Sequence, residues 1–90
     1  MIRYLIVVDG RVQGVGFRYF TQITAHTLNL TGWCENLMSG QVKIEIQGLE
    51  NDVHSFIATI KRGNNFCRVD NINLTNIDII SDEKKYKIRY

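Results

Sequence analysis

The sequence predicts an α+β fold in which two helices cover one face of a mainly antiparallel β-sheet. Apolar residues recur at helical spacing in two segments, and they alternate or run continuously in the segments around them. The predicted order is β-α-β-β-α-β, followed by a short extra strand. Because crossover connections are right-handed, we expect both helices on the same face, as in the ferredoxin-like sandwich.

The composition is typical of one globular domain. The 90 residues are expected to form a single domain, residues 1–90, because a chain of this length has room for one core. The net charge is +2 with scattered Lys and Arg, so we expect no nucleic-acid partner. No apolar run is long enough to cross a bilayer, and no secretory signal is recognisable, so we expect a cytoplasmic protein without a membrane partner.

In the first half of the chain, the run Tyr4–Val8 predicts a central strand that is buried on both faces or nearly so. A set of residues at helical spacing then predicts a helix of about 12 to 14 residues. That set is Phe17, Phe20, Ile23, Thr24 and Leu28. Asn29 suits the left-handed conformation that ends a helix. Thr31–Met38 predicts a second strand, and Ser39-Gly40 predicts a tight turn.

In the second half, the alternation of apolar and polar residues over Val42–Ile46 predicts a strand with one buried face. Apolar residues at helical spacing over Leu49–Ile60 predict a second helix. The alternation changes phase within Ile72–Ile79, so we expect a bulge or bend near Thr75–Asn76 in a fourth strand. Tyr86–Tyr90 alternates again and predicts the short final strand.

The segment Gly10–Arg18 carries the clearest indication of chemistry. Gly14 and Gly16 permit positive φ, so successive amides can turn toward one point at the start of the first helix. A helix N-terminus adds unpaired N–H groups, and the guanidinium of Arg18 matches two phosphate oxygens. These features predict a cradle for a phosphate-like anion. The residues alone also allow a simpler interpretation, in which the glycines only make a sharp turn and Arg18 is solvated.

Other glycine-loop and metal motifs fit poorly. No Gly-Lys-Ser/Thr follows the loop, as a nucleotide-binding P-loop requires, and Tyr19 stands where a dinucleotide motif needs its third glycine. His26 and His54 have no partner at ligand spacing, and the two cysteines have none either, so we expect no metal and no cofactor. We expect reduced cysteines, with Cys34 packed in the core.

The run Gly10–Arg18 resembles the N-terminal signature of acylphosphatases. Gly32–Leu37 and Gly40–Val42 resemble the second signature of that family, and the closing Tyr86–Tyr90 extends the resemblance over nearly the whole chain. The resemblance implies hydrolysis of the carboxyl–phosphate bond of acyl phosphates to carboxylate and inorganic phosphate. Acetyl, carbamoyl and 1,3-bisphosphoglycerate-type phosphates all present this reacting group.

The resemblance also implies the roles of the site residues. Arg18 binds the phosphate together with the loop amides, and Asn36 positions the attacking water. The implied phosphate-binding loop consists of Gln13, Gly14, Val15, Gly16 and Phe17. A side-chain amide does not titrate, so Asn36 can orient a water but cannot act as a base. The family picture is that the substrate's own phosphate takes the proton of the water.

The same resemblance implies the partners. They are a small acyl phosphate substrate, with inorganic phosphate or sulfate as a further ligand of the site. Edge strands rich in Lys favour a monomer. The sequence departs from the usual family pattern at Cys34, Ser39 and Gly63-Asn64, where valine, aspartate and Gly-Pro are usual. None of these is a catalytic position. The departure at Gly63-Asn64 leaves the conformation of residues 64 to 68 open.

The alternatives are a ferredoxin-like RNA-binding or regulatory module and a part of a larger carbamoyl-transfer enzyme. Gln13–Phe20 matches an RNA-binding motif at both glycines and at its two phenylalanines. That motif belongs on a strand, whereas this segment runs into a helix that would bury both rings. Intact Arg18 and Asn36 argue against a regulatory module, and a self-contained domain of 90 residues argues for a free-standing enzyme.

Overall fold

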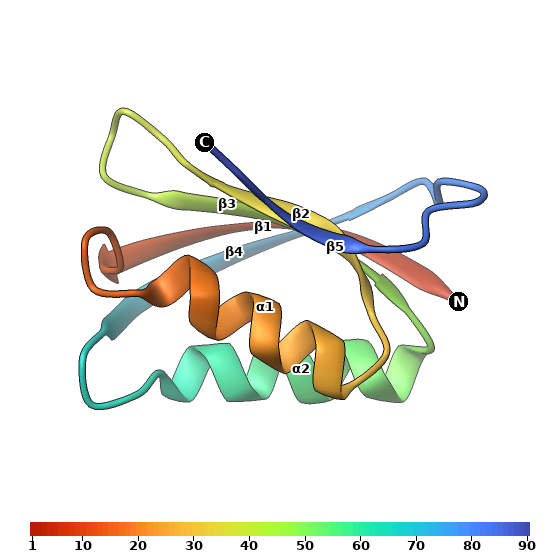
Figure 1. Cartoon of the computed structure of the whole chain (residues 1–90), viewed down its shortest axis with the longest axis horizontal. Helices are drawn as coiled ribbons and strands as arrows, with labels where there is room; N and C mark the ends of the chain where they lie inside the picture. Colours follow the sequence, from red (N-terminus) through yellow and green to blue (C-terminus); the bar gives the residue numbers. More distant parts are fainter.

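The computed structural model describes all 90 residues and has the predicted order of elements. The strands are β1 (Ile2–Arg11), β2 (Thr31–Asn36), β3 (Val42–Gly48), β4 (Arg68–Ile77) and β5 (Tyr86–Arg89). The helices are α1 (Phe17–Thr27) and α2 (Glu50–Arg62). One sheet, in the order β4-β1-β3-β2-β5, has both helices on the same face (Figure 1). The ferredoxin-like prediction is confirmed, and β5 is the extra strand.

The sheet is antiparallel except at one edge, where β5 runs parallel to β2. β1 lies between β3 and β4, which agrees with its prediction as a central strand. Its side chains Ile6 and Val8 are fully buried under the helices. Leu5 and Val7 point to the other face and are only half-buried. Burial on both faces is therefore not observed, because no helix covers the outer face.

Helix α1 contacts the sheet through Phe17, Thr21 and Ala25, which are buried. Ile23 was predicted on the apolar face but is 48% exposed. At about 100° per residue, the spacing of four between the buried positions directs Ile23 away from the core. The helix ends as predicted, with Asn29 in the left-handed region at φ 56°.

In helix α2 the buried face, the charged residues of the first and last turns and the terminating glycine agree with the sequence. Val53, Phe56 and Ile60 are buried against the sheet. Acidic residues occupy its first turn and basic residues its last, which suits the helix dipole. Gly63 ends the helix at φ 71°. In the connection that follows, the Asn64 side-chain oxygen accepts hydrogen bonds from two backbone amides, so residues 64–67 form a local turn.

The β2–β3 connection contains the predicted tight turn at Ser39-Gly40, but within a longer loop. β2 ends at Asn36 rather than at Met38. Leu37 N donates to the Gln41 carbonyl at 2.8 Å, and Gly40 N donates to the Leu37 carbonyl at 3.1 Å. The chain therefore reverses over residues 37–41, which is longer than a two-residue hairpin loop. This longer turn brings backbone carbonyls to the end of β2.

The predicted bulge near Thr75–Asn76 is wrong. β4 pairs with β1 in regular register through those residues and ends at Ile77. The change of phase in the sequence marks the end of the strand, because Ile79 already lies beyond it.

The irregularity lies at the other end of this strand pair. The register shifts between Asp9 and Gly10, so that Asp70 is the extra residue of β4. Gly10 adopts φ 141°, and a Cβ there would collide with the Arg68 carbonyl oxygen. Only glycine suits this position, just before the chain leaves β1 for the loop.

The outer face of the sheet contains a buried arginine. Arg3 donates hydrogen bonds to Glu83 at 2.7 Å, to Glu45 at 2.9 Å and to Gln47 at 3.1 Å, and its side chain has no exposed surface. Burial would lower the pKa of Arg3, but the bonds and charges of the two carboxylates outweigh it and raise that pKa. Glu83 belongs to the β4–β5 connection, so this cluster fastens the connection to the sheet.

We expect Arg3→Met to lower the free energy of unfolding by about 1–3 kcal/mol, because two partly buried carboxylates would lose their partner. Urea denaturation followed by circular dichroism measures this change. Arg68→Met is the control, since Arg68 pairs with Asp70 at an exposed position and its loss should have no measurable effect. Equal midpoints for the two variants would contradict the role given to the cluster.

Candidate active site

The loop between β1 and α1 presents free backbone amides. Gly14 and Gly16 adopt φ 72° and 77°, in the left-handed region, and the space on their Cβ sides is open. No side chain caps the start of α1, and its first turn contains no acidic residue. Because the first amides of a helix lack partners within the helix, this loop offers several donors to an anion.

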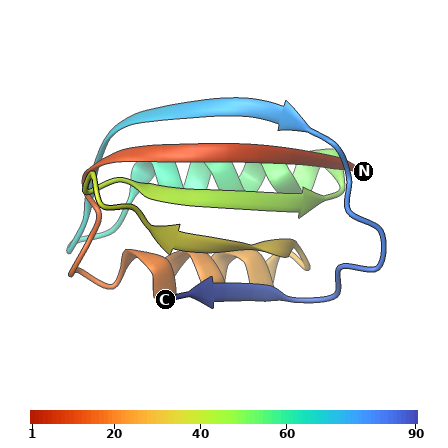
Figure 2. The same ribbon diagram turned by 90° about the horizontal axis from the view of Figure 1, so that it is seen from above.

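The side chain of Gln13 fastens this loop to the β2–β3 turn. Its Nε2 donates to the Leu37 and Gln41 carbonyls, both at 2.8 Å. The Gln41 side chain in turn donates to an Asp9 carboxylate oxygen at 2.8 Å. Two loops that are distant in sequence are thereby held together beside Asn36, at one end of the molecule (Figure 2).

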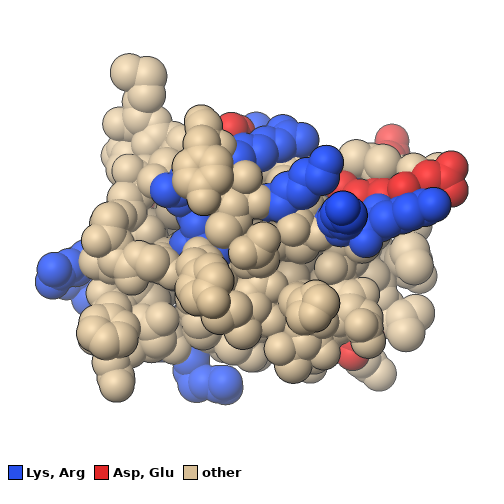
Figure 3. All heavy atoms as spheres, in the orientation of Figure 1, with Lys and Arg blue, Asp and Glu red and all other residues tan.

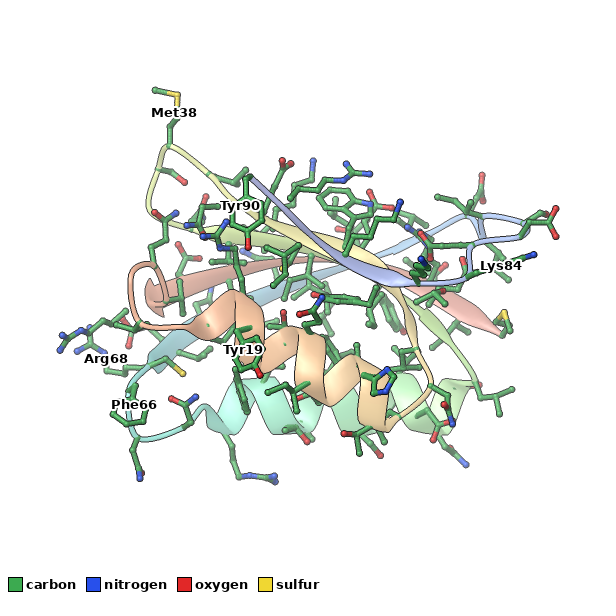
Figure 4. All side chains as sticks on the ribbon, viewed as in Figure 1. Tyr19, Met38, Phe66, Arg68, Lys84 and Tyr90 are labelled. Carbon is green, nitrogen blue, oxygen red and sulfur yellow. The ribbon has the colours of Figure 1, made fainter.

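The chain's last two residues anchor Arg18, the second residue of α1. Its Nη1 donates to the Arg89 carbonyl at 3.2 Å, and its Cζ lies 4.9 Å from the centroid of the Tyr90 ring. Tyr90 lies over the start of α1 (Figure 4). The guanidinium is therefore held against the end of β5 and is not the fully solvated group of the simpler interpretation.

Asn36 is the last residue of β2 and lies on the face covered by α1. The direction follows from Cys34, two residues earlier, whose Sγ lies 3.5 Å from Thr21 of α1. Asn36 Oδ1 is buried and accepts no hydrogen bond from any protein group. Buried side-chain oxygens nearly always have a partner, so this free acceptor marks a group suited to bind a water or a ligand.

The structure brings the predicted loop, Arg18 and Asn36 to the same end of the fold. These groups do not bond to one another and are linked only through neighbouring residues. Gln13 links the loop to Leu37, next to Asn36. Thr21 links the backbone of Arg18 to Cys34. No hydrogen bond joins Arg18 to Asn36 or either side chain to the loop amides. The arrangement leaves all three sets of groups available to a third molecule.

The surface near β5 is rich in basic side chains. Lys and Arg atoms lie on the upper half of the front face, over β5, and Asp and Glu atoms lie beside them toward the right-hand end (Figure 3). Positive charges near a site attract anionic ligands, and here Arg18 supplies one. No group of three or more His, Cys, Asp or Glu side chains is placed to hold a metal ion. Neither helix is long and apolar enough to span a membrane.

Two contacts of this region are not predicted from the sequence, that of Tyr90 with Arg18 and that of Gln13 with the β2–β3 turn. The alternation of Tyr86, Ile88 and Tyr90 could have placed Tyr90 on the side of the helices, although not over Arg18. No sequence signal indicates the tie made by Gln13, because it depends on a turn more than twenty residues away.

Comparison with known proteins points to one family. The family model described as acylphosphatase matches residues 4–88. An acylphosphatase of Clostridium beijerinckii is 59% identical over 90 residues, which is the full length of both chains. The crystal structure of acylphosphatase from Bacillus subtilis is 42% identical, covers 100% of both chains and has a TM-score of 0.94. Full-length HypF is 34% identical over 99% of this chain and 12% of its own, with a TM-score of 0.89.

We expect Gln13→Leu to lower the free energy of unfolding by about 1–2 kcal/mol, because two hydrogen bonds between the loops are lost. The amides of residues 37–41 should also exchange with solvent faster than in the wild type. Urea denaturation and hydrogen exchange measure the two effects. Gln22→Leu is the control, since the Gln22 side chain makes no hydrogen bond. Equal behaviour of both variants would refute the tie.

Proposed function

This chain belongs to the acylphosphatase family and is an enzyme that hydrolyses acyl phosphates, and we propose that residues 13–17, Arg18 and Asn36 form its active site. The observation that supports this assignment most directly is the buried, unpartnered oxygen of Asn36 at the same end of the fold as a loop of free amides. A buried acceptor beside an anion-binding loop is the combination that a water and a phosphate require.

In this proposal the phosphate of the substrate lies on the loop. The backbone amides of Gln13 to Phe17 donate to its oxygens, and Arg18 supplies the positive charge. The bond to the Arg89 carbonyl uses one of the five N–H donors of Arg18, so the others remain for phosphate oxygens. Tyr90 and the end of β5 restrict the guanidinium, which lowers the entropy lost when it binds the phosphate.

Hydrolysis then requires a positioned water rather than a strong base. Asn36 Oδ1 accepts a hydrogen bond from the water, and this bond directs the lone pair of the water oxygen at phosphorus. The new P–O bond forms while the bond between phosphorus and the acyl oxygen breaks, and its electron pair leaves with the carboxylate. The proton of the water passes to a phosphate oxygen of the substrate. Catalysis is thus positioning plus stabilisation of charge by Arg18 and the loop amides.

The same proposal includes the further ligands, the cellular location and the oligomeric state of the enzyme. Inorganic phosphate and sulfate are expected to bind the loop, because they present the same tetrahedral oxygens. A cytoplasmic location is carried over from the sequence as part of the proposal, and a monomeric state is supported by edge strands that disfavour association. β5 exposes Lys87 and Arg89, and the outer strand β4 exposes mainly polar side chains.

We expect Arg18→Ala and Asn36→Ala to lower kcat/KM for benzoyl phosphate by at least about 10²–10³-fold, since each would remove stabilisation of roughly 3–4 kcal/mol. Loss of the acyl phosphate measured over time gives the rates. Lys84→Ala is the control, because Lys84 lies at the opposite end of the molecule (Figure 4) and should leave the rate unchanged. Wild-type turnover by Arg18→Ala would exclude this site.

We also expect inorganic phosphate to stabilise the native state. At tenfold excess over Kd the gain is about 1.4 kcal/mol, which raises the Tm of a domain this size by several degrees. Thermal unfolding in phosphate, in sulfate and in chloride of matched ionic strength tests the effect. Arg18→Ala should lose the increase. A Tm that stays constant at tens of millimolar phosphate would contradict binding by the loop.

A further inference from the structure

A buried set of hydrogen bonds lies behind Arg18 and joins α1, β2 and β5. Thr21 Oγ1 donates to the backbone carbonyl of Arg18 at 2.7 Å. The Tyr86 hydroxyl donates to the same Thr21 oxygen at 2.9 Å. Cys34 Sγ lies 3.5 Å from Thr21 Oγ1 and 4.0 Å from the Arg18 carbonyl oxygen. All these bonds meet on the first turn of α1.

The groups of this set are buried and neutral, and the distances between them indicate which group donates to which. Thr21 and Cys34 are fully buried, and Tyr86 is 9% exposed. Burial raises the pKa of the Cys34 thiol and raises that of the Tyr86 hydroxyl well above its ordinary value, so both groups are neutral. Each hydroxyl has a single proton to donate. Tyr86 donates to Thr21, and the Thr21 proton is directed at the Arg18 carbonyl, because that oxygen lies at 2.7 Å whereas Cys34 Sγ lies at 3.5 Å.

Thr21 differs from the other helical threonines. Thr24, Thr27 and Thr59 each donate only to the carbonyl four residues earlier, as threonine commonly does in a helix. Thr21 donates to the carbonyl three residues earlier, and it also contacts Cys34 of β2 and Tyr86 of β5. The Thr21 hydroxyl therefore links α1 to two strands, whereas the other three hydroxyls bond only within their own helices.

The set controls where Arg18 lies relative to Asn36. Cys34 precedes Asn36 by two residues on the same face of β2, so the contact with Thr21 sets the distance between α1 and that part of the strand. Tyr86 begins β5, and the end of β5 holds the guanidinium of Arg18 through Arg89 and Tyr90. The backbone and the side chain of Arg18 are thus both fixed by β5.

We propose that Thr21 and Tyr86 are positioning residues, which hold Arg18 in the place where it can act together with Asn36. This inference rests on the proposed function, in which Arg18 and Asn36 carry the reaction. Thr21 and Tyr86 do not touch the substrate. Their effect on the rate comes from the orientation of the first turn of α1.

Substitutions that remove one hydroxyl and keep the volume test the proposal. Thr21→Val and Tyr86→Phe should each lower kcat for benzoyl phosphate about tenfold, equivalent to about 1.4 kcal/mol in the barrier. Thr21→Ser keeps the hydroxyl and should restore most of the rate. Thr24→Val is the matched control, because it removes a helical hydroxyl that bonds only to its own helix. All rates are measured where urea curves show each variant to be folded.

The double variant Thr21→Val/Tyr86→Phe adds a second test. Because the two hydroxyls act in one series, its loss should equal the larger single loss rather than the product of both. Variants that are less stable but keep the wild-type kcat would show a merely structural role and overturn the proposal, as would a Thr21→Ser enzyme as slow as Thr21→Val. If Arg18→Ala were fully active, the proposed active site itself would fail.

Discussion

The register of the three central strands is the constraint on which the site depends. Val42 of β3 pairs with Val8 of β1 and also with Asn36 of β2, so these residues form one row across the sheet. The row places Asn36 near the point where β1 leads into the glycine loop. A slip of one residue in β2 would turn Asn36 to the outer face, away from α1 and the loop. The pairing of strands therefore decides whether the loop and the amide can serve one ligand.

The two faces of the sheet have different roles. The face under the helices is apolar at the sheet centre and polar around Thr21, Cys34 and Tyr86, where the hydrogen bonds converge behind Arg18. The outer face has no covering helix and is held by the charged cluster around Arg3. Because that cluster fastens the β4–β5 connection, it also places β5, and through β5 it contributes to the position of Arg18.

The structure also explains why the RNA-binding alternative has no support. The phenylalanines that match the motif lie on α1, where Phe17 is buried and Phe20 is half-buried, so they do not form the strand platform on which this motif stacks bases. Trp33 lies on the outer face, but the guanidinium of Arg89 covers its ring at 4.0 Å. The relatives are acylphosphatases over the full length of the chain.

The sequence by itself determined what depends on local periodicity and local backbone preference. The order of the elements, the left-handed Asn29 and the glycine loop before α1 were predictable, because each is decided within a few residues. Only the tertiary structure decided the tie from Gln13 to the β2–β3 turn, the contact of Arg18 with Tyr90 and the bonds among Thr21, Tyr86 and Arg18. Those contacts join segments far apart in the chain, and their geometry follows from strand register and helix packing, which no local pattern encodes.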